Sequence, residues 1–342
     1  MLTVDRSRIA HKIIGDVLSR KARDGPEAGA PAPFRVTIDV SMVKFDLTRR
    51  QFLRGLTAAS LVGLSATSAY AGLVEPHDYE VTAHDIFIRN LPDAFDGFRI
   101  AQVSDVHHSS IVSLEEVWRV VELAGKAKAD LIVLTGDYTT ARRRYIEPCV
   151  EALATLRSPE GVWAVLGNHD HYTDAELTTR ALKRARINVL SNANTLLRRG
   201  ADTLQLAGVD DWSWGKTDWA RAGRGLDRTR PSILLSHQPI VFDMPQARDF
   251  SLILSGHTHG GQIVFPIIGA PVRLIREFRY VSGLYENPAT KLYVSRGTGT
   301  IGLPVRLGAR PEIAVLRLRR ATDSLQQTGV FTSLLSSKPL IG

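Results

Sequence analysis

Short runs of Val, Ile and Leu recur along the chain after residue 72, separated by longer amphipathic or polar segments. Several runs are almost continuously apolar, as expected of β-strands that are covered on both faces. The candidate strands span residues 99–103, 131–134, 162–166, 204–209, 233–235, 252–254, 292–294 and 313–318. Because amphipathic helical segments alternate with them, the sequence predicts an α/β sandwich formed by one domain, residues 72–320.

Two of the predicted helices carry start signals. Ser113 is followed three residues later by Glu116, which is the spacing of a capping box. Thr173 and Glu176 repeat this spacing. The pattern therefore predicts helices that begin just after Ser113 and just after Thr173.

Polar clusters directly follow five of the candidate strands. In an open α/β sheet, ligands gather beyond the carboxyl ends of the strands, so these clusters are expected to converge although they are far apart in sequence. Any one of them alone would fit an ordinary turn or a structural histidine, whereas the whole series favours a single site. The clusters contain Asp105 and His107, then Asp137, then Asn168, His169 and Asp170, then His237, and finally His257 and His259.

Carboxylate and imidazole together suit Mn, Fe or Zn, whereas Ca²⁺ and Mg²⁺ favour oxygen ligands alone. The Asp-X-His and His-X-His spacings predict that both side chains of each pair lie on one side of an extended segment. Glycines precede Asp137, Asn168 and His257, which predicts tight turns that bring backbone close to the site.

The motifs Asp105-Val-His107, Gly136-Asp137, Gly167-Asn-His-Asp170, His237 and Gly256-His-Thr-His259 resemble those of the calcineurin-like metallophosphoesterases, in order and through residues 98–318. The context is most similar to their exported bacterial phosphodiesterase branch. A tyrosine that binds metal in the purple acid phosphatases is replaced by Thr140, which disfavours that subclass.

The resemblance implies a four-layer sandwich of two mixed β-sheets flanked by helices. It also implies two divalent metal ions, Mn²⁺ first and Fe or Zn as alternatives. One ion would be held by Asp105, His107 and His259, the other by Asn168, His237 and His257, with Asp137 as the bridge. His169 would be the proton donor or transition-state stabiliser, steered by Asp170.

The predicted activity is hydrolysis of phosphodiester or pyrophosphate bonds, with a metal-bridged water attacking phosphorus. Relatives in that branch imply phospholipid or lipid-sugar diphosphate substrates. A nuclease or cyclic-nucleotide phosphodiesterase is the alternative enzyme, and a metal-binding envelope scaffold is the alternative without turnover. Candidate substrate contacts are Arg296, His108 and His171. The alternatives are a surface position or a supporting position behind the ligands for the two histidines, and an ion pair with an acid for Arg296.

Residues 263–280 mix apolar side chains with Arg273, Arg276 and Arg279 directly after the metal-site histidines. Such a segment predicts either contact with an anionic membrane or acyl chain, or core packing with a basic rim. The sequence does not separate these two interpretations.

The first 71 residues are predicted to be an N-terminal extension followed by a targeting signal, and not part of the folded domain. Arg49, Arg50 and Arg54 precede a weakly apolar run that ends in Ala69-Tyr70-Ala71, which resembles a twin-arginine export signal with cleavage after Ala71. The prediction is export through the twin-arginine translocase to the periplasm or the outer face of the cytoplasmic membrane. Met42 is a possible natural start, and residues 321–342 are expected to form a loose tail.

Charge and cysteine content exclude other classes. Residues 1–71 hold eleven Lys and Arg against six Asp and Glu, so most of the formal net charge of +8 belongs to the leader and no nucleic-acid partner is expected. Cys149 is the single cysteine, which excludes an intramolecular disulfide and cysteine-based zinc sites.

Overall fold

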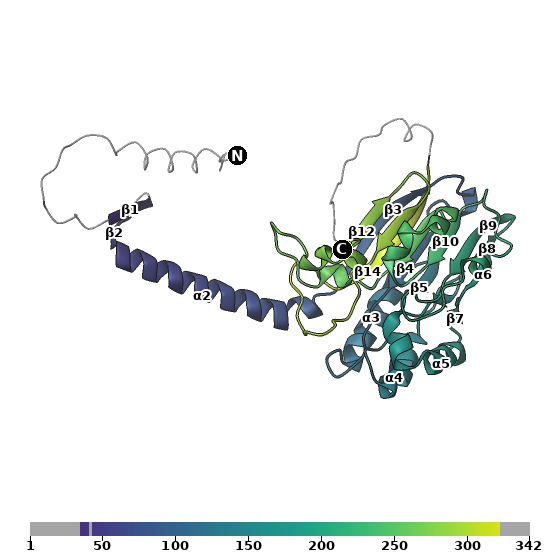
Figure 1. Cartoon of the computed structure of the whole chain (residues 1–342), viewed down its shortest axis with the longest axis horizontal. Helices are drawn as coiled ribbons and strands as arrows, with labels where there is room; N and C mark the ends of the chain where they lie inside the picture. Colours follow the sequence, from purple (N-terminus) through teal and green to yellow (C-terminus); the bar gives the residue numbers. More distant parts are fainter. Residues whose placement is uncertain (1–34, 41–42, 322–342) are drawn as a thin grey trace, which may run out of the picture. The chain divides into compact units, whose positions relative to one another are not determined.

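The computed structural model describes residues 35–40 and 43–321, and these fall into two compact units that divide between Leu64 and Ser65. In the first unit, β1 (Arg35–Val40) pairs antiparallel with β2 (Val43–Thr48), and α2 (Arg49–Leu73) begins there and runs past the division (Figure 1). Met42 and the predicted tail from residue 322 onward lie outside the described residues. Within those residues one helix, Arg50–His77, is long and apolar enough to cross a membrane by length and composition alone.

The second unit contains two six-stranded mixed sheets. In the first sheet all neighbours are parallel except β14 and β4. Its order is β3 (Glu80–Ile88), β14 (Glu312–Arg320), β4 (Arg99–Val103), β5 (Leu131–Leu134), β6 (Val162–Ala164) and β7 (Asn188–Val189).

In the second sheet the four central strands run parallel and both edge strands are antiparallel to their neighbours. Its order is β12 (Gly283–Glu286), β13 (Lys291–Val294), β11 (Leu252–Ser255), β10 (Ser232–Leu235), β9 (Asp202–Gly208) and β8 (Ala193–Arg199).

Alternation along the strands explains the layers. In β4, Ile100 faces the core between the two sheets, whereas Ala101 and Val103 face the helices α3 (Leu114–Lys126), α4 (Ile146–Leu153) and α5 (Asn168–Arg184). Figure 1 shows these three helices together on one side of the body. The far face of the second sheet is covered by α6 (Trp219–Ala222) and the 3-10 turns η4 (Pro239–Asp243) and η5 (Pro245–Asp249). The predicted four-layer architecture is therefore confirmed.

One predicted helix start is confirmed and the other is wrong. The Ser113 hydroxyl accepts the Glu116 N–H at 3.2 Å, and the Glu116 carboxylate accepts the Ser113 N–H at 2.7 Å. By contrast, α5 begins at Asn168 and is interrupted at Asp174, where φ is −179° and ψ is 91°. There the Asp174 carboxylate accepts the Leu177 N–H at 2.9 Å, so the cap lies one residue after Thr173.

Candidate metal centre

All seven predicted metal ligands lie together at the carboxyl ends of strands from both sheets. They follow β4, β5 and β6 of the first sheet and β10 and β11 of the second. The two sheets are linked directly here. The ring of His237, which follows β10 of the second sheet, donates from Nδ1 to the carbonyl of Thr135, which follows β5 of the first sheet, at 2.7 Å. Five of the seven are buried, whereas Asn168 and His257 are half-buried. The strand-end positions of the polar motifs thus place them in one site.

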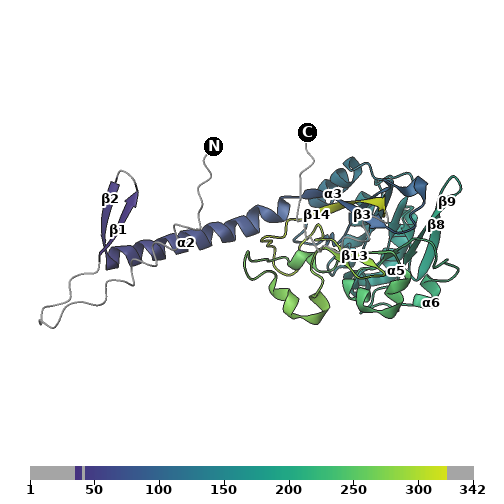
Figure 2. The same ribbon diagram turned by 90° about the horizontal axis from the view of Figure 1, so that it is seen from above.

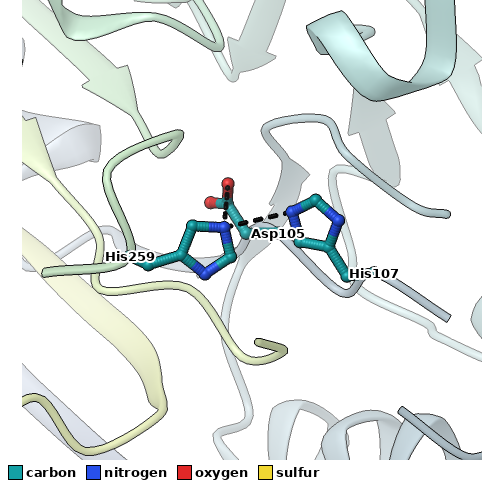
Figure 3. A group of neighbouring side chains, drawn as sticks. All are labelled: Asp105, His107 and His259. Carbon is teal, nitrogen blue, oxygen red and sulfur yellow. Dashed lines mark hydrogen bonds and ion pairs between the residues drawn. The ribbon is translucent and has the colours of Figure 1, made fainter. Parts of the chain in front are cut away.

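A first cluster consists of Asp105, His107 and His259 (Figure 3). The Nε2 atoms of the two imidazoles lie 3.0 Å apart, and His259 Nε2 lies 3.5 Å from an Asp105 carboxylate oxygen. His259 Nδ1 donates to the Gly299 carbonyl at 3.1 Å, so Nε2 of the neutral ring carries a lone pair. A lone pair that faces a carboxylate and another imidazole nitrogen is the arrangement of a cation site.

A second cluster consists of Asp137, His237 and His257, with Asn168 beside it. His237 Nε2 lies 3.2 Å from the Asp137 Oδ2 atom, 3.2 Å from His257 Nδ1 and 3.1 Å from the Asn168 side-chain oxygen. The same Asp137 oxygen lies 3.4 Å from His107 Nε2 in the first cluster. One carboxylate oxygen therefore stands between the two clusters.

The protonation preferences of three of the four candidate histidines fit metal binding, whereas for His237 the Asp137 carboxylate outweighs burial and raises the pKa to about 10. Burial lowers the pKa of His107 and of His257 to about 3 each, and it holds the pKa of His259 well below its ordinary value. These rings are thus neutral and able to donate lone pairs. Burial opposes ionisation of Asp137, but the adjoining His237 outweighs it and lowers the pKa of that carboxyl. This mixed nitrogen and oxygen donor set suits divalent transition metals and does not by itself select one of them.

The backbone at the site is strained. Five of the seven predicted ligands have φ between 52° and 72°, in the left-handed region that residues other than glycine rarely adopt. They are Asp105, His107, Asp137, His257 and His259. The expected extended geometry for the Asp-X-His and His-X-His pairs is therefore wrong, because each chain turns sharply after its strand.

Glycines make the close approach of the loops possible, as predicted. A Cβ atom on Gly256 would collide with the side chains of Ser104 and Asp105. One on Gly167 would collide with the Asp137 carboxylate and come within 2.8 Å of His237 Nδ1. Any side chain at these two positions would displace the candidate ligands.

His169 and Asp170 occupy the first turn of α5 but do not form the expected pair. His169 Nδ1 donates to the Thr140 carbonyl at 2.6 Å. The Asp170 carboxylate instead accepts N–H groups of Asp137, Tyr138 and Gly167 at 2.8–2.9 Å. The expectation that Asp170 steers His169 is thus wrong: the Thr140 carbonyl orients the ring, and Asp170 ties the loops after β5 and β6 together.

The three candidate substrate contacts all have partners within the protein. Arg296 forms an ion pair with Glu80 at 2.8 Å, which is the alternative that the sequence left open. His108 is buried, and its Nδ1 donates to a backbone carbonyl at 2.9 Å. His171 pairs with Asp210 at 2.7 Å. Contact of these residues with a substrate stays a prediction.

Arg306 was not singled out by any motif. Its side chain is fully buried, and among the described residues its hydrogen-bond partners are backbone carbonyls and not carboxylates. Its N–H groups donate to the carbonyls of His259, Arg296, Gly297, Gly299 and Ala309 at 2.5–3.4 Å. Because the Gly299 carbonyl also accepts from His259 Nδ1, Arg306 fixes the loop that sets the tautomer of a candidate ligand.

Comparison with known proteins agrees with this geometry. The calcineurin-like phosphoesterase family matches residues 98–261. The uncharacterized metallophosphoesterase YkuE of Bacillus subtilis is 35% identical over 280 residues, which is 80% of this chain and 98% of that protein. Phosphodiesterase YaeI of Escherichia coli is 30% identical over 80% of this chain and 99% of its own length. A bovine transmembrane protein with metallophosphoesterase domain is 33% identical over 81% of this chain, which spans 65% of the bovine protein. The chain therefore belongs to the calcineurin-like phosphoesterase family and is a metallophosphoesterase.

Proposed function

We propose that the protein hydrolyses phosphodiesters with two divalent metal ions bound at this centre. The observation that carries the proposal is the position of Asp137 Oδ2, which lies 3.4 Å from His107 Nε2 and 3.2 Å from His237 Nε2. A single oxygen between two histidine clusters suits a bridging ligand. Asp105, His107 and His259 would hold one ion, and Asn168, His237 and His257 the other. Bound there, the ions would supply Lewis-acid stabilisation of the phosphoryl group and an activated water.

The residues of the chain supply the proton and the orientation. His169 donates from Nδ1 to the Thr140 carbonyl, so in the protonated ring the Nε2–H is left to give its proton to the leaving-group oxygen, and the ring becomes neutral. Its backbone N–H donates to Asp137 Oδ1 at 2.9 Å, which holds the proton donor beside the proposed bridging carboxylate. Asp170 holds the backbone of both loops. Positioning and electrostatics of this kind are the main demands of phosphoryl transfer.

Mn²⁺ is the first choice of metal, and a diester carried by a lipid is the proposed substrate class. The mixed donor set supports a divalent transition metal, of which Mn²⁺ is one, and the name of the Escherichia coli relative supports a diester. We further propose export by the twin-arginine route to the periplasm or the outer face of the cytoplasmic membrane. The paired arginines at the start of a long apolar helix support this location.

The full chain, stripped of metal and then given Mn²⁺, Fe²⁺ or Zn²⁺, is expected to hydrolyse bis(p-nitrophenyl) phosphate and to bind two ions. Asp137→Asn is expected to lose nearly all turnover. Asp85→Asn is the matched control, because Asp85 pairs with Arg317 on the exposed face of β3 and should leave turnover unchanged. One ion per chain would refute the paired centre. Two ions without turnover of any diester would refute the hydrolase and favour a metal-binding scaffold.

A further inference from the structure

The segment 263–280, here called the apolar loop, exposes large hydrophobic side chains. Ile267 is 98% exposed, Leu274 93% and Ile268 80%. Core packing, one of the two interpretations that the sequence allowed, is therefore wrong for these side chains. Exposed apolar side chains gathered in one loop mark an interaction surface more often than scattered single residues do. Figure 2 shows this green segment standing out beside the sheets.

The base of the loop is fastened to the metal centre. The Phe278 ring stacks on His257, with centroids 5.2 Å apart and planes 8° from parallel. The hydroxyl of Thr258, between the two candidate histidine ligands, donates to the Val281 carbonyl at 2.5 Å. The loop thus leaves the centre after His259 and returns to it at Phe278. Whatever covers its exposed side chains is held at the rim of the catalytic site.

The apolar loop is also cationic. Arg273 and Arg276 lie in the short turns η7 (Pro271–Leu274) and η8 (Arg276–Phe278), and both are exposed. Neither forms an ion pair with any residue that the structure describes, whereas Arg279 pairs with Asp243 at 3.0 Å. Glu277 is the one acidic residue in the segment. Unpaired cations among exposed aliphatic side chains match the interface of an anionic bilayer.

We propose that the apolar loop inserts into the surface of an anionic lipid bilayer and so presents the metal centre to phosphodiesters in lipid headgroups. The membrane contact stands on the loop itself, and the headgroup substrate rests on the proposed function. A second copy of this chain is the weaker occupant, because a two-fold contact through this loop would bring two cationic loops, each with Arg273 and Arg276, against each other. An anionic membrane buries the aliphatic side chains and neutralises both arginines.

Membrane insertion is tested with a single fluorescent label on the full chain. Cys149 is fully buried, so Ile268→Cys introduces the one accessible thiol among the described residues. Leu196→Cys, on β8 in a distant part of the second sheet, is the control. With vesicles of phosphatidylglycerol and phosphatidylcholine, a polarity-sensitive label at 268 is expected to shift to the blue and to be quenched by lipids with a quencher in the acyl chain. The label at 196 should do neither. An unshifted, unquenched label at 268 would overturn the proposal.

The link to the substrate is tested by a ratio of two activities. Ile267→Ser, Ile268→Ser and Leu274→Ser combined should lower turnover of phosphatidylglycerol in vesicles at least about tenfold, since removing buried aliphatic side chains weakens insertion. Turnover of soluble bis(p-nitrophenyl) phosphate is the internal reference and should stay within about twofold. An unchanged ratio would overturn the headgroup assignment while leaving the hydrolase intact. No soluble turnover in the unmodified chain would instead refute the proposed function.

Sedimentation of the same triple variant addresses the competing occupant. The unmodified chain and the variant are expected to sediment as the same species. If the unmodified chain is a dimer and the variant a monomer, with no insertion of the label at 268, the surface binds a second copy and the membrane proposal falls. Arg273→Gln with Arg276→Gln should remove the preference for phosphatidylglycerol over phosphatidylcholine vesicles. An unchanged preference would contradict the role of charge.

Discussion

Replacing His169 by Ala should abolish proton donation without removing metal. The side chain makes one hydrogen bond, from Nδ1 to the Thr140 carbonyl, and edge contacts with His107 and Tyr172 at 4.9 and 6.4 Å between ring centroids. The N–H that binds Asp137 belongs to the backbone and survives any substitution. Loss of one half-buried hydrogen bond costs about 1 kcal/mol of folding free energy, so the fold should persist. General-acid catalysis is worth about 10²–10⁴-fold, which raises the barrier by about 3–5 kcal/mol.

The assay compares leaving groups. A dialkyl phosphodiester expels an alkoxide that needs a proton, and its turnover should fall by about 10²–10⁴-fold in His169→Ala. Bis(p-nitrophenyl) phosphate expels a stable phenolate, so its turnover should fall less than about tenfold. His77→Ala is the control, because His77 is an exposed histidine paired with Glu116 on the surface. Metal content is measured on every preparation.

Two results would refute this interpretation. His169 also groups with His107 and Asp137, with potential ligand atoms within 4.8 Å of one another. If His169→Ala binds one ion where the unmodified chain binds two, His169 is a ligand and not the proton donor. If both substrates lose the same factor with the metal intact, the side chain stabilises the phosphoryl group and does not protonate the leaving oxygen.

Three further predictions concern the residues that support the centre. Burial opposes ionisation of Glu312, but contacts with His84 and Arg296 outweigh it and lower its pKa from 4.5 to about 2. The ionised carboxylate therefore stabilises the fold by about 3 kcal/mol above pH 4.5, and this stabilisation is lost as the pH falls toward 2. Glu312→Gln should accordingly be less stable to urea at pH 7, and its free energy of unfolding should fall less between pH 4.5 and pH 2 (the acid limb of the stability curve). Arg306→Met should lose at least about 3 kcal/mol in the same measurement, because several carbonyls lose their donor, and Arg306→Lys should recover part of it. Gly256→Ala should lower metal affinity and cost about 1–3 kcal/mol, whereas Gly125→Ala, in open space on α3, should be neutral or stabilising. An acid limb that is unchanged in Glu312→Gln would contradict the argument for Glu312. The argument for Arg306 fails if Arg306→Lys is no more stable than Arg306→Met, and the argument for Gly256 fails if Gly256→Ala keeps full metal affinity.

The central strands could be predicted because they are buried on both faces. Each predicted run coincides with a strand, from β4 to β14, with ends that differ by a few residues. The strands that were missed have weaker patterns. In β3, β8 and β12 exposed and half-buried positions predominate, and β7 has two residues. Edge strands carry polar residues on their open sides, so no continuous apolar run marks them.

The candidate ligands could be predicted from residue type and position after a strand, but their support could not. Asp170 looked like a partner for its sequence neighbour His169, whereas it binds backbone N–H groups 32 and 33 residues away. Arg306 reaches carbonyls that become neighbours when the loops after β11 and β13 meet. Neither the contacts of Asp170 nor those of Arg306 leave a periodic or compositional signal in the sequence, because their partners are backbone groups, which every residue has.

The free-energy cost of the candidate metal centre, in backbone strain and buried imidazoles, indicates that cations occupy it. A non-glycine residue in the left-handed region costs about 1–3 kcal/mol, and five candidate ligands adopt it. Beside them the neutral His107 and His259 rings are buried with their Nε2 atoms 3.0 Å apart, and the Nε2 lone pair of His259 faces an Asp105 carboxylate oxygen at 3.5 Å. Neither feature stabilises the fold by itself, since hydrogen-bonded rings on relaxed turns would cost less. Both become favourable when cations fill the space between the lone pairs, so the protein is expected to be markedly more stable with metal than without it.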